Sequence, residues 1–135
     1  MSFPNDPKGT KQISSLQIPV AVTSTANGSG VDFGACDQSG LLVIHVGAVT
    51  GISPTLALKL QESKNDNTLD ASGAAEAYAD ITGATASLTD ADASSIITVR
   101  VNNRSRKYVR LVKTAGGTSP SFTVGVTFIA DKKTF

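Results

Sequence analysis

The chain has 135 residues, the size of one ordinary domain, and a formal net charge of only +1. Charged residues make up 17% of it, below the roughly 25% of an average soluble protein, while Ala 16, Ser 15 and Thr 15 dominate. Strong helix formers other than Ala are scarce, so this composition argues against a helical bundle. The small net charge argues against a protein built mainly to coat nucleic acid.

The first residues predict an extended arm followed by a strand. Pro4 and Pro7 interrupt a segment without any periodic apolar face, and from Leu16 to Thr25 apolar and polar residues alternate. We therefore expect an extended N-terminal arm over residues 1–15 and a single domain over residues 16–135. Pro19 cannot donate a ladder hydrogen bond, which places this strand at an edge or at a bulge.

The middle of the chain is the most apolar part. After a turn at residues 27–30 and a short strand at 31–35, the run 41–49 (LLVIHVGAV) has two apolar faces, which predicts a central strand covered on both sides. A Gly-Ile-Ser-Pro segment at 51–54 interrupts it, and residues 55–61 alternate again. This pattern predicts a hairpin. Residues 63–76 are polar and small, which predicts a long loop.

The last part of the chain predicts further short strands. We expect strands at 78–82, 97–101, 108–112 and 122–128, with turns at 102–105 and 116–120. Residues 83–95 are rich in turn residues, and a helical turn capped by Thr89 or Asp90 fits there.

An internal repeat relates two of these segments. Residues 41–62 align without gaps with residues 107–128 at an offset of 66, and both copies contain Gly-x-Ser-Pro. The structural turn residues are Gly51, Pro54, Gly117 and Pro120. Two similar hairpins with one apolar face each can bury these faces against each other. The pattern predicts an all-β, single-domain antiparallel β-sandwich, jelly-roll-like in character; chance similarity between two hairpins of similar composition is the alternative.

The residues that could carry chemistry are few. His45 lies within the most apolar strand, and Cys36 has no second cysteine with which to form an internal disulfide, so both are interpreted as quiet structural residues. The acidic segments at 65–70 and 90–92 lack the twelve-residue calcium pattern. We therefore expect no enzyme, no cofactor and no metal site. We also expect no membrane segment, and synthesis in a reducing cytoplasm.

Several segments together resemble a known family. They are GAVTGISPTL (47–56), QES (61–63), YADITGAT (78–85), KYVR (107–110) and GTSPSF (117–122). In this order they are similar to small structural proteins encoded among the head genes of tailed bacteriophages, over roughly residues 16–130. The resemblance implies a capsid decoration, or cement, protein. Such a protein is a β-sandwich in the virion that binds the outer shell and ties neighbouring major capsid subunits together.

Candidate contacts follow from the arm and from the basic residues near the end of the chain. Six of the twelve Lys and Arg residues lie between positions 100 and 113, and Arg100 and Arg110 could lie side by side on paired strands. This segment argues against a nucleic-acid ligand, because bases stack on aromatic side chains and a single aromatic residue, Tyr108, lies among these basic residues. The candidate capsid-contact residues are Phe3, Pro4, Pro7, Lys8, Arg100, Arg104, Arg106 and Arg110.

Two other functions remain open at this point. A head–tail connector or tail-tube protein is also rich in β-structure and of similar size. A carbohydrate-binding module is disfavoured because aromatic residues are 5% of the chain and Trp is absent. If the chain is a capsid decoration protein, as the resemblance implies, its partners are the major capsid protein and further copies of the chain itself.

Overall fold

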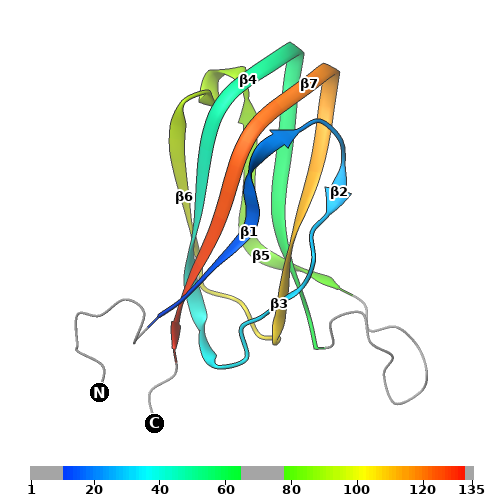
Figure 1. Cartoon of the computed structure of the whole chain (residues 1–135). Helices are drawn as coiled ribbons and strands as arrows, with labels where there is room; N and C mark the ends of the chain where they lie inside the picture. Colours follow the sequence, from blue (N-terminus) through cyan, green and yellow to red (C-terminus); the bar gives the residue numbers. More distant parts are fainter. Residues whose placement is uncertain (1–10, 65–77, 133–135) are drawn as a thin grey trace.

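The computed structural model describes residues 11–64 and 78–132, and it confirms an all-β, antiparallel fold (Figure 1). The predicted contact residues Phe3, Pro4, Pro7 and Lys8 lie outside the described residues. The elements are β1 (Lys11–Val22), β2 (Ala26–Asn27), β3 (Val31–Asp32), β4 (Cys36–Ser63), β5 (Ala79–Thr89), the 3-10 turn η1 (Asp90–Asp92), β6 (Ser95–Val101) and β7 (Tyr108–Lys132).

Two long strands, β4 and β7, form the centre of the molecule and bend sharply at one end (Figure 1). Each strand rises in one layer and descends in the other. The β1 layer consists of β6, residues 36–50 of β4, residues 121–132 of β7, and β1. The β5 layer consists of β5, residues 55–63 of β4, residues 108–116 of β7, and the short strands β2 and β3. The single sheet is thereby folded into a β-sandwich.

The predicted hairpins within each repeat are wrong. Residues 41–49 and 55–61 belong to the one strand β4, and they pair with β7 instead of with each other. The connection Gly-Ile-Ser-Pro changes the direction of the chain, but it carries the strand across to the opposite layer. The same is true of residues 116–120 in β7. Each repeat is therefore a bent strand, and the two repeats are hydrogen-bonded neighbours.

The internal repeat is confirmed as a feature of the structure, and it extends further than the sequence indicated. At the bend Ile52 pairs with Thr118, its own equivalent 66 residues later. The equivalence continues into the outer strands. Strand β1 pairs with the second half of β7, and β5, which is equivalent to β1, pairs with the second half of β4. Val22 lies opposite Phe122, and the equivalent residues Leu88 and Leu56 lie opposite each other. The chain is thus two similar units, β1 to β4 and β5 to β7, that share a central strand pair.

The bend requires unusual backbone conformations at equivalent positions in both repeats. Gly51 has a φ of 117° and Gly117 a φ of 93°, while Ser53 and Ser119 both have a φ of 48°. Side chains are strained in this region of φ, so glycine fits the tightest point of each bend. Gly51 and Gly117 thus lie at bends within continuous strands, and not in turns that join two paired strands.

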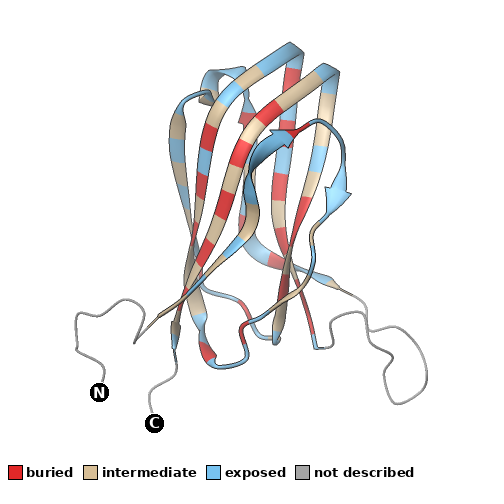
Figure 2. Cartoon of the chain, viewed as in Figure 1, coloured by how far each residue is buried: buried red, intermediate tan, exposed pale blue. Residues whose placement is uncertain are grey.

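The core lies between the two layers, and alternate residues of β4 and β7 supply most of it (Figure 2). Strand alternation explains this pattern because successive side chains point to opposite faces. At one end of the core Phe33 meets Phe128 edge-on, with ring centroids 5.0 Å apart. The largest fully buried side chains are Phe33, Phe122, Phe128, Leu42, Ile44, Leu56, Leu58, Leu60, Leu88, Leu111, Val46 and Val101.

Two strands, β1 and β5, extend beyond the bounds expected from the sequence, whereas one expected turn is present. Strand β1 begins at Lys11, so residues 11–15 of the expected arm belong to the sheet. Strand β5 continues to Thr89 through residues expected to form turns, because its small side chains suit an edge strand beside β4. The expected helical turn is present as η1, where Thr89 caps it and the Asp92 carboxylate accepts the Thr89 backbone N–H at 2.8 Å.

Candidate interaction surface

The outer surface of the β1 layer carries large aliphatic side chains on all four strands, with polar residues among them: His45 on β4 and Thr98 on β6 are both exposed there. Ile13 lies opposite Ile129 on the neighbouring strand, and Ile129 lies opposite Leu41, so one row of large aliphatic side chains crosses three strands. The next row contains Thr127 and Val43. We define the apolar face by its outward-facing aliphatic residues Ile13, Leu41, Val43, Ile96 and Ile129.

No part of the described chain covers this face. Ile96 is 64% exposed and Ile13 is 50% exposed. The sequence predicted that strand 41–49 is covered on both sides; here Leu41 and Val43 are only half-buried, by their strand neighbours. A cluster of aliphatic side chains that is partly exposed to water is a candidate surface for a protein partner.

Charged groups lie at one end of the apolar face. Lys11 and Asp131 form an ion pair there, and Arg100 lies opposite Leu41 on β6. These side chains rim a hollow of about 340 Å³ whose floor includes Leu41 and Ile129. An apolar centre with a charged rim is the arrangement typical of protein interfaces.

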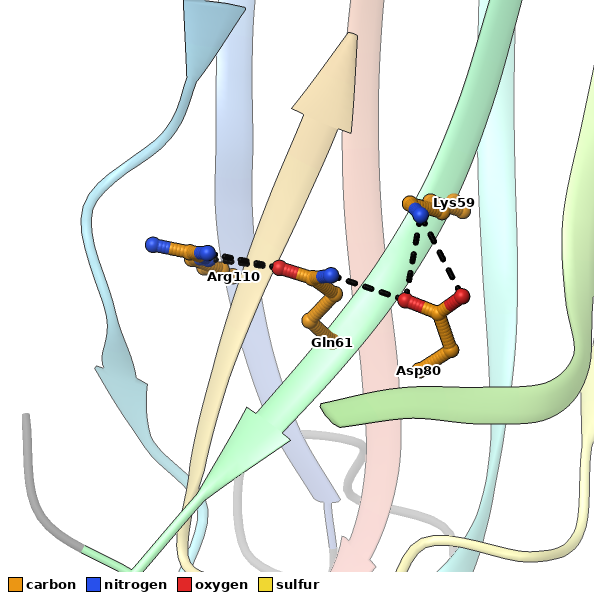
Figure 3. A network of polar contacts seen from close by, with 4 residues as sticks. All are labelled: Lys59, Gln61, Asp80 and Arg110. Carbon is orange, nitrogen blue, oxygen red and sulfur yellow. Dashed lines mark hydrogen bonds and ion pairs between the residues drawn. The ribbon is translucent and has the colours of Figure 1, made fainter. Parts of the chain in front are cut away.

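The outer surface of the β5 layer has the opposite character, because a chain of polar contacts crosses it (Figure 3). Arg110 donates from Nε and Nη2 to Gln61 Oε1, at 2.9 and 2.7 Å. Gln61 Nε2 donates to Asp80 Oδ1 at 2.7 Å, and Lys59 Nζ lies 3.2 Å from Asp80 Oδ2. The hydrogen bond from Gln61, followed by that from Lys59, lowers the pKa of the Asp80 carboxyl. The polar groups of this face satisfy one another.

The end of the sandwich opposite the bends is held by two buried charged residues. Arg104 is 4% exposed, and its Nη2 donates to the carbonyl oxygens of Cys36 at 2.8 Å and Asp37 at 2.6 Å. Glu62, 7% exposed, accepts the backbone N–H groups of Ser105 at 2.8 Å and Arg106 at 3.1 Å. Together these two side chains fix the start of β4 and the connection between β6 and β7.

Burial shifts the pKa of the Arg104 guanidinium and of the neighbouring Cys36 thiol. It lowers the pKa of the Arg104 guanidinium, while the nearby Cys36 and Glu62 act in the opposite direction. Burial likewise raises the pKa of the Cys36 thiol. The positive charge of Arg104 acts in the opposite direction and offsets part of this increase. A guanidinium remains protonated at neutral pH, so Arg104 acts as a permanent donor to the surrounding carbonyls.

The four arginines predicted as contacts do not form one patch. Arg100 and Arg110 lie on the outer surfaces of opposite layers, so the expectation that they lie side by side is wrong. Arg104 is buried, and its predicted role in surface contact is replaced by a structural one. Arg106 lies in the connection between β6 and β7 and donates its backbone N–H to Glu62.

The apolar face was not identified from the sequence, although a signal for it was present. Leu41 and Val43 alternate with the buried Leu42 and Ile44, and an apolar residue at every position of a strand was interpreted as burial inside this chain. The same pattern is produced by a strand whose second face is covered by another molecule.

Comparisons with known proteins do not add to this description. A search of protein-family models found no match to the chain, and a search of curated protein sequences found none either. Within residues 11–64 and 78–132, no helix has the length and apolar character needed to cross a bilayer. The same residues contain no grouping of three or more His, Cys, Asp or Glu side chains placed to hold a metal ion.

Proposed function

We propose that the protein is a structural virion component that binds the outer surface of a phage capsid and stabilises contacts between major capsid subunits. The observation that carries the proposal is the contrast between the two outer surfaces of the sandwich. The apolar face is exposed at Ile13 and Ile96, whereas the opposite surface is covered by the mutually satisfied contacts of Lys59, Gln61, Asp80 and Arg110. One surface suits a protein partner, and the other suits solvent.

The architecture supports this role through its rigidity. The central strands β4 and β7 pair over most of their length, and their bends lock the two layers together. A rigid scaffold loses little conformational freedom when it docks, so more of the contact free energy remains for binding. Many copies on a shell would multiply contacts that are individually modest. The sequence resemblance to phage head proteins points to the same class of partner, the major capsid protein.

The proposal is tested on purified particles of the phage that encodes the chain. Mass spectrometry is expected to find the protein in a fixed ratio to the shell protein, and particles assembled without it are expected to lose their contents at a lower temperature. Labelling is expected to mark the whole shell. Equal heat resistance of complete and depleted particles, or labelling confined to the tail vertex, contradicts the cementing role.

A pair of variants connects this function to the apolar face. Val43→Glu places a charge at the centre of the face and is expected to weaken rebinding to depleted particles at least about tenfold, because an interface core disfavours an unpaired charge. Ala57→Glu is the control, since Ala57 is exposed on β4 in the opposite layer. Unchanged rebinding by the Val43→Glu protein would exclude the apolar face as the docking surface.

A further inference from the structure

The edges of the sheet differ in how well they are protected against pairing with another strand. An exposed edge presents unpaired backbone N–H and C=O groups, and proteins usually blunt it with proline, bulges, charges or short length. Strand β1 contains Pro19 and two register shifts. Strand β5 has a register shift against β4 and Gly83 at a φ of 83°. Strands β2 and β3 have two residues each.

Strand β6 has none of these features except one charged residue, Arg100. Its seven residues, Ser95–Val101, pair with β4 without a register shift, and they include neither proline nor glycine. In Figure 1 β6 forms the outer margin of the β1 layer, with β4 on one side. Half of the backbone hydrogen-bonding groups of such a strand point away from its neighbour. The edge is therefore regular in its pairing and able to accept a partner strand.

The side chains of β6 also remain incompletely covered. Ile96 is 64% exposed on the outer surface. Ile97 and Val99 face the core but are only partly buried, since the strand lies at the margin. A further strand along β6 would cover both sets of side chains and complete the hydrogen-bond ladder.

We infer that β6 pairs antiparallel with β6 of a second copy of this chain, about a twofold axis at Thr98. Thr98 is the central residue of the strand, so this register pairs all seven residues. Ile97 then lies opposite Val99 of the second copy, and Ile96 lies opposite Arg100 of the second copy. A closed twofold dimer of this kind uses the same surface on both copies.

The charge pattern of the strand permits self-pairing. Arg100 is the charged residue of β6, and in this register it lies beside the aliphatic Ile96 of the second copy. The two Arg100 side chains are four strand positions apart, about 13 Å, which exceeds the Debye length of about 8 Å in physiological salt. No like charges meet directly across the axis, where they would oppose pairing.

This dimer does not depend on the proposed capsid role. It would place two β1 layers in one continuous sheet, so that the apolar faces of both copies lie on the same side. Dimerisation is tested by sedimentation equilibrium of the full chain over a range of concentrations, where a monomer–dimer equilibrium is expected. A chain that remains monomeric up to its solubility limit overturns the inference.

Substitutions in one row of the layer test the position of the interface. Thr98→Lys puts two ammonium groups side by side at the axis and is expected to raise the dimer dissociation constant about fivefold. Ser15→Lys is the matched control, because Ser15 is also an exposed hydroxyl residue in the same row but on β1, at the far edge. Equal effects of the two substitutions, or an effect of Ser15→Lys alone, place the interface elsewhere and overturn the inference.

Cysteine cross-linking tests the register. The single natural thiol, Cys36, is 2% exposed, so the natural protein is the control for cross-linking that does not involve an introduced cysteine. Under oxidising conditions Thr98→Cys is expected to form a disulfide-linked dimer, because directly opposite residues lie within disulfide reach. Ile96→Cys is expected to remain unlinked, since its two copies are about 13 Å apart. Cross-linking of Ile96→Cys but not Thr98→Cys would contradict the twofold at Thr98.

Discussion

Gly51 in the bend of β4 lies directly against Ser119 in the bend of β7. A Cβ atom added to Gly51 would lie 2.8 Å from the carbonyl oxygen of Ser119. The relationship is reciprocal, because the atom nearest to a Cβ added to Gly117 would be the carbonyl oxygen of Ser53, the equivalent of Ser119, and the carbonyl oxygen of Ile52 would lie 2.9 Å away. Each repeat thus leaves space for the backbone of the other, and the two bends form one unit. This contact explains why the same short motif occurs twice in the chain.

Alanine at either bend glycine is expected to destabilise the fold. Gly51→Ala and Gly117→Ala combine a positive φ with a steric clash against backbone, and each should lower the free energy of unfolding by about 3 kcal/mol. Gly83→Ala is the control, because Gly83 also has a positive φ but its added Cβ would meet nothing within 4 Å. We expect the control to lose about 1 kcal/mol. Chemical denaturation measures all three, and equal losses would show that the clash does not matter.

The fold class was predictable from the sequence, but the path of the chain was not. Alternation of apolar and polar residues marks a strand wherever one face is buried, and it identified most of β4, β6 and β7. Gly51 and Pro54 lie where β4 changes direction, although they were expected in a hairpin turn. These residues carry no information on whether the flanking segments pair with each other or cross to separate layers, because both geometries need the same backbone freedom.

The extent of the internal repeat shows the same limit. Between β1 and β5 the equivalent residues Val22 and Leu88 are both buried without being identical, whereas Ile18 is 64% exposed and its equivalent Ala84 is fully buried. A repeat that is maintained in the strand pairing but not in the residues leaves no signal that an alignment of this one chain could detect.

The candidate surface was harder to predict than the fold. Arg100, Arg104 and Arg110 are close in sequence, yet they lie on one outer surface, in the interior and on the opposite outer surface. Sequence proximity does not determine position here because β6 and the first half of β7 belong to different layers. The apolar face, in contrast, is composed of residues far apart in sequence, such as Ile13 and Ile96.

Removal of the Arg104 side chain is expected to loosen the end of the sandwich. Arg104→Ala leaves the carbonyl groups of Cys36 and Asp37 without their guanidinium donor, and we expect a loss of about 3 kcal/mol in the free energy of unfolding. The exposed Arg100 serves as the control, and Arg100→Ala should change stability by no more than about 0.5 kcal/mol. Thermal and urea unfolding measure both variants. A neutral Arg104→Ala would show that the buried guanidinium is dispensable.

The Cys36 thiol is expected to be unreactive in the folded protein. Burial raises its pKa, and the thiolate is the form that reacts with alkylating agents. Modification by iodoacetamide at neutral pH should therefore be slow until denaturant exposes the residue. The thiol introduced by Ser15→Cys, at an exposed position, should react rapidly under the same conditions. Rapid labelling of native Cys36 would contradict its burial.

The raised pKa of Cys36 also predicts a pH dependence of stability. A thiol whose pKa is raised in the folded state stabilises the fold fully below its ordinary pKa, and this contribution is lost as the pH rises through the folded value. The free energy of unfolding of the natural protein should thus fall more steeply at alkaline pH than that of Cys36→Ala. Parallel curves for the two proteins would show that Cys36 does not contribute.

The polar chain on the β5 layer gives the opposite dependence, at acidic pH. The Gln61 amide, ahead of Lys59, lowers the pKa of the Asp80 carboxyl. The stabilisation is therefore present above the ordinary carboxyl pKa and is lost as the pH falls through the lowered folded value. Gln61→Ala removes the largest cause, so the Asp80 titration midpoint measured by NMR should rise towards its ordinary value.

Two further variants make the Asp80 titration decisive. Lys59→Ala should raise the midpoint by less than Gln61→Ala, because the contribution of Lys59 ranks second. Gln17→Ala should leave it unchanged, since Gln17 belongs to β1 in the other layer and its Oε1 accepts from Lys113. If Lys59→Ala shifts the midpoint and Gln61→Ala does not, charge attraction and not the amide hydrogen bond controls this carboxylate. The arrangement in Figure 3 would then act as an ion pair with a neutral neighbour.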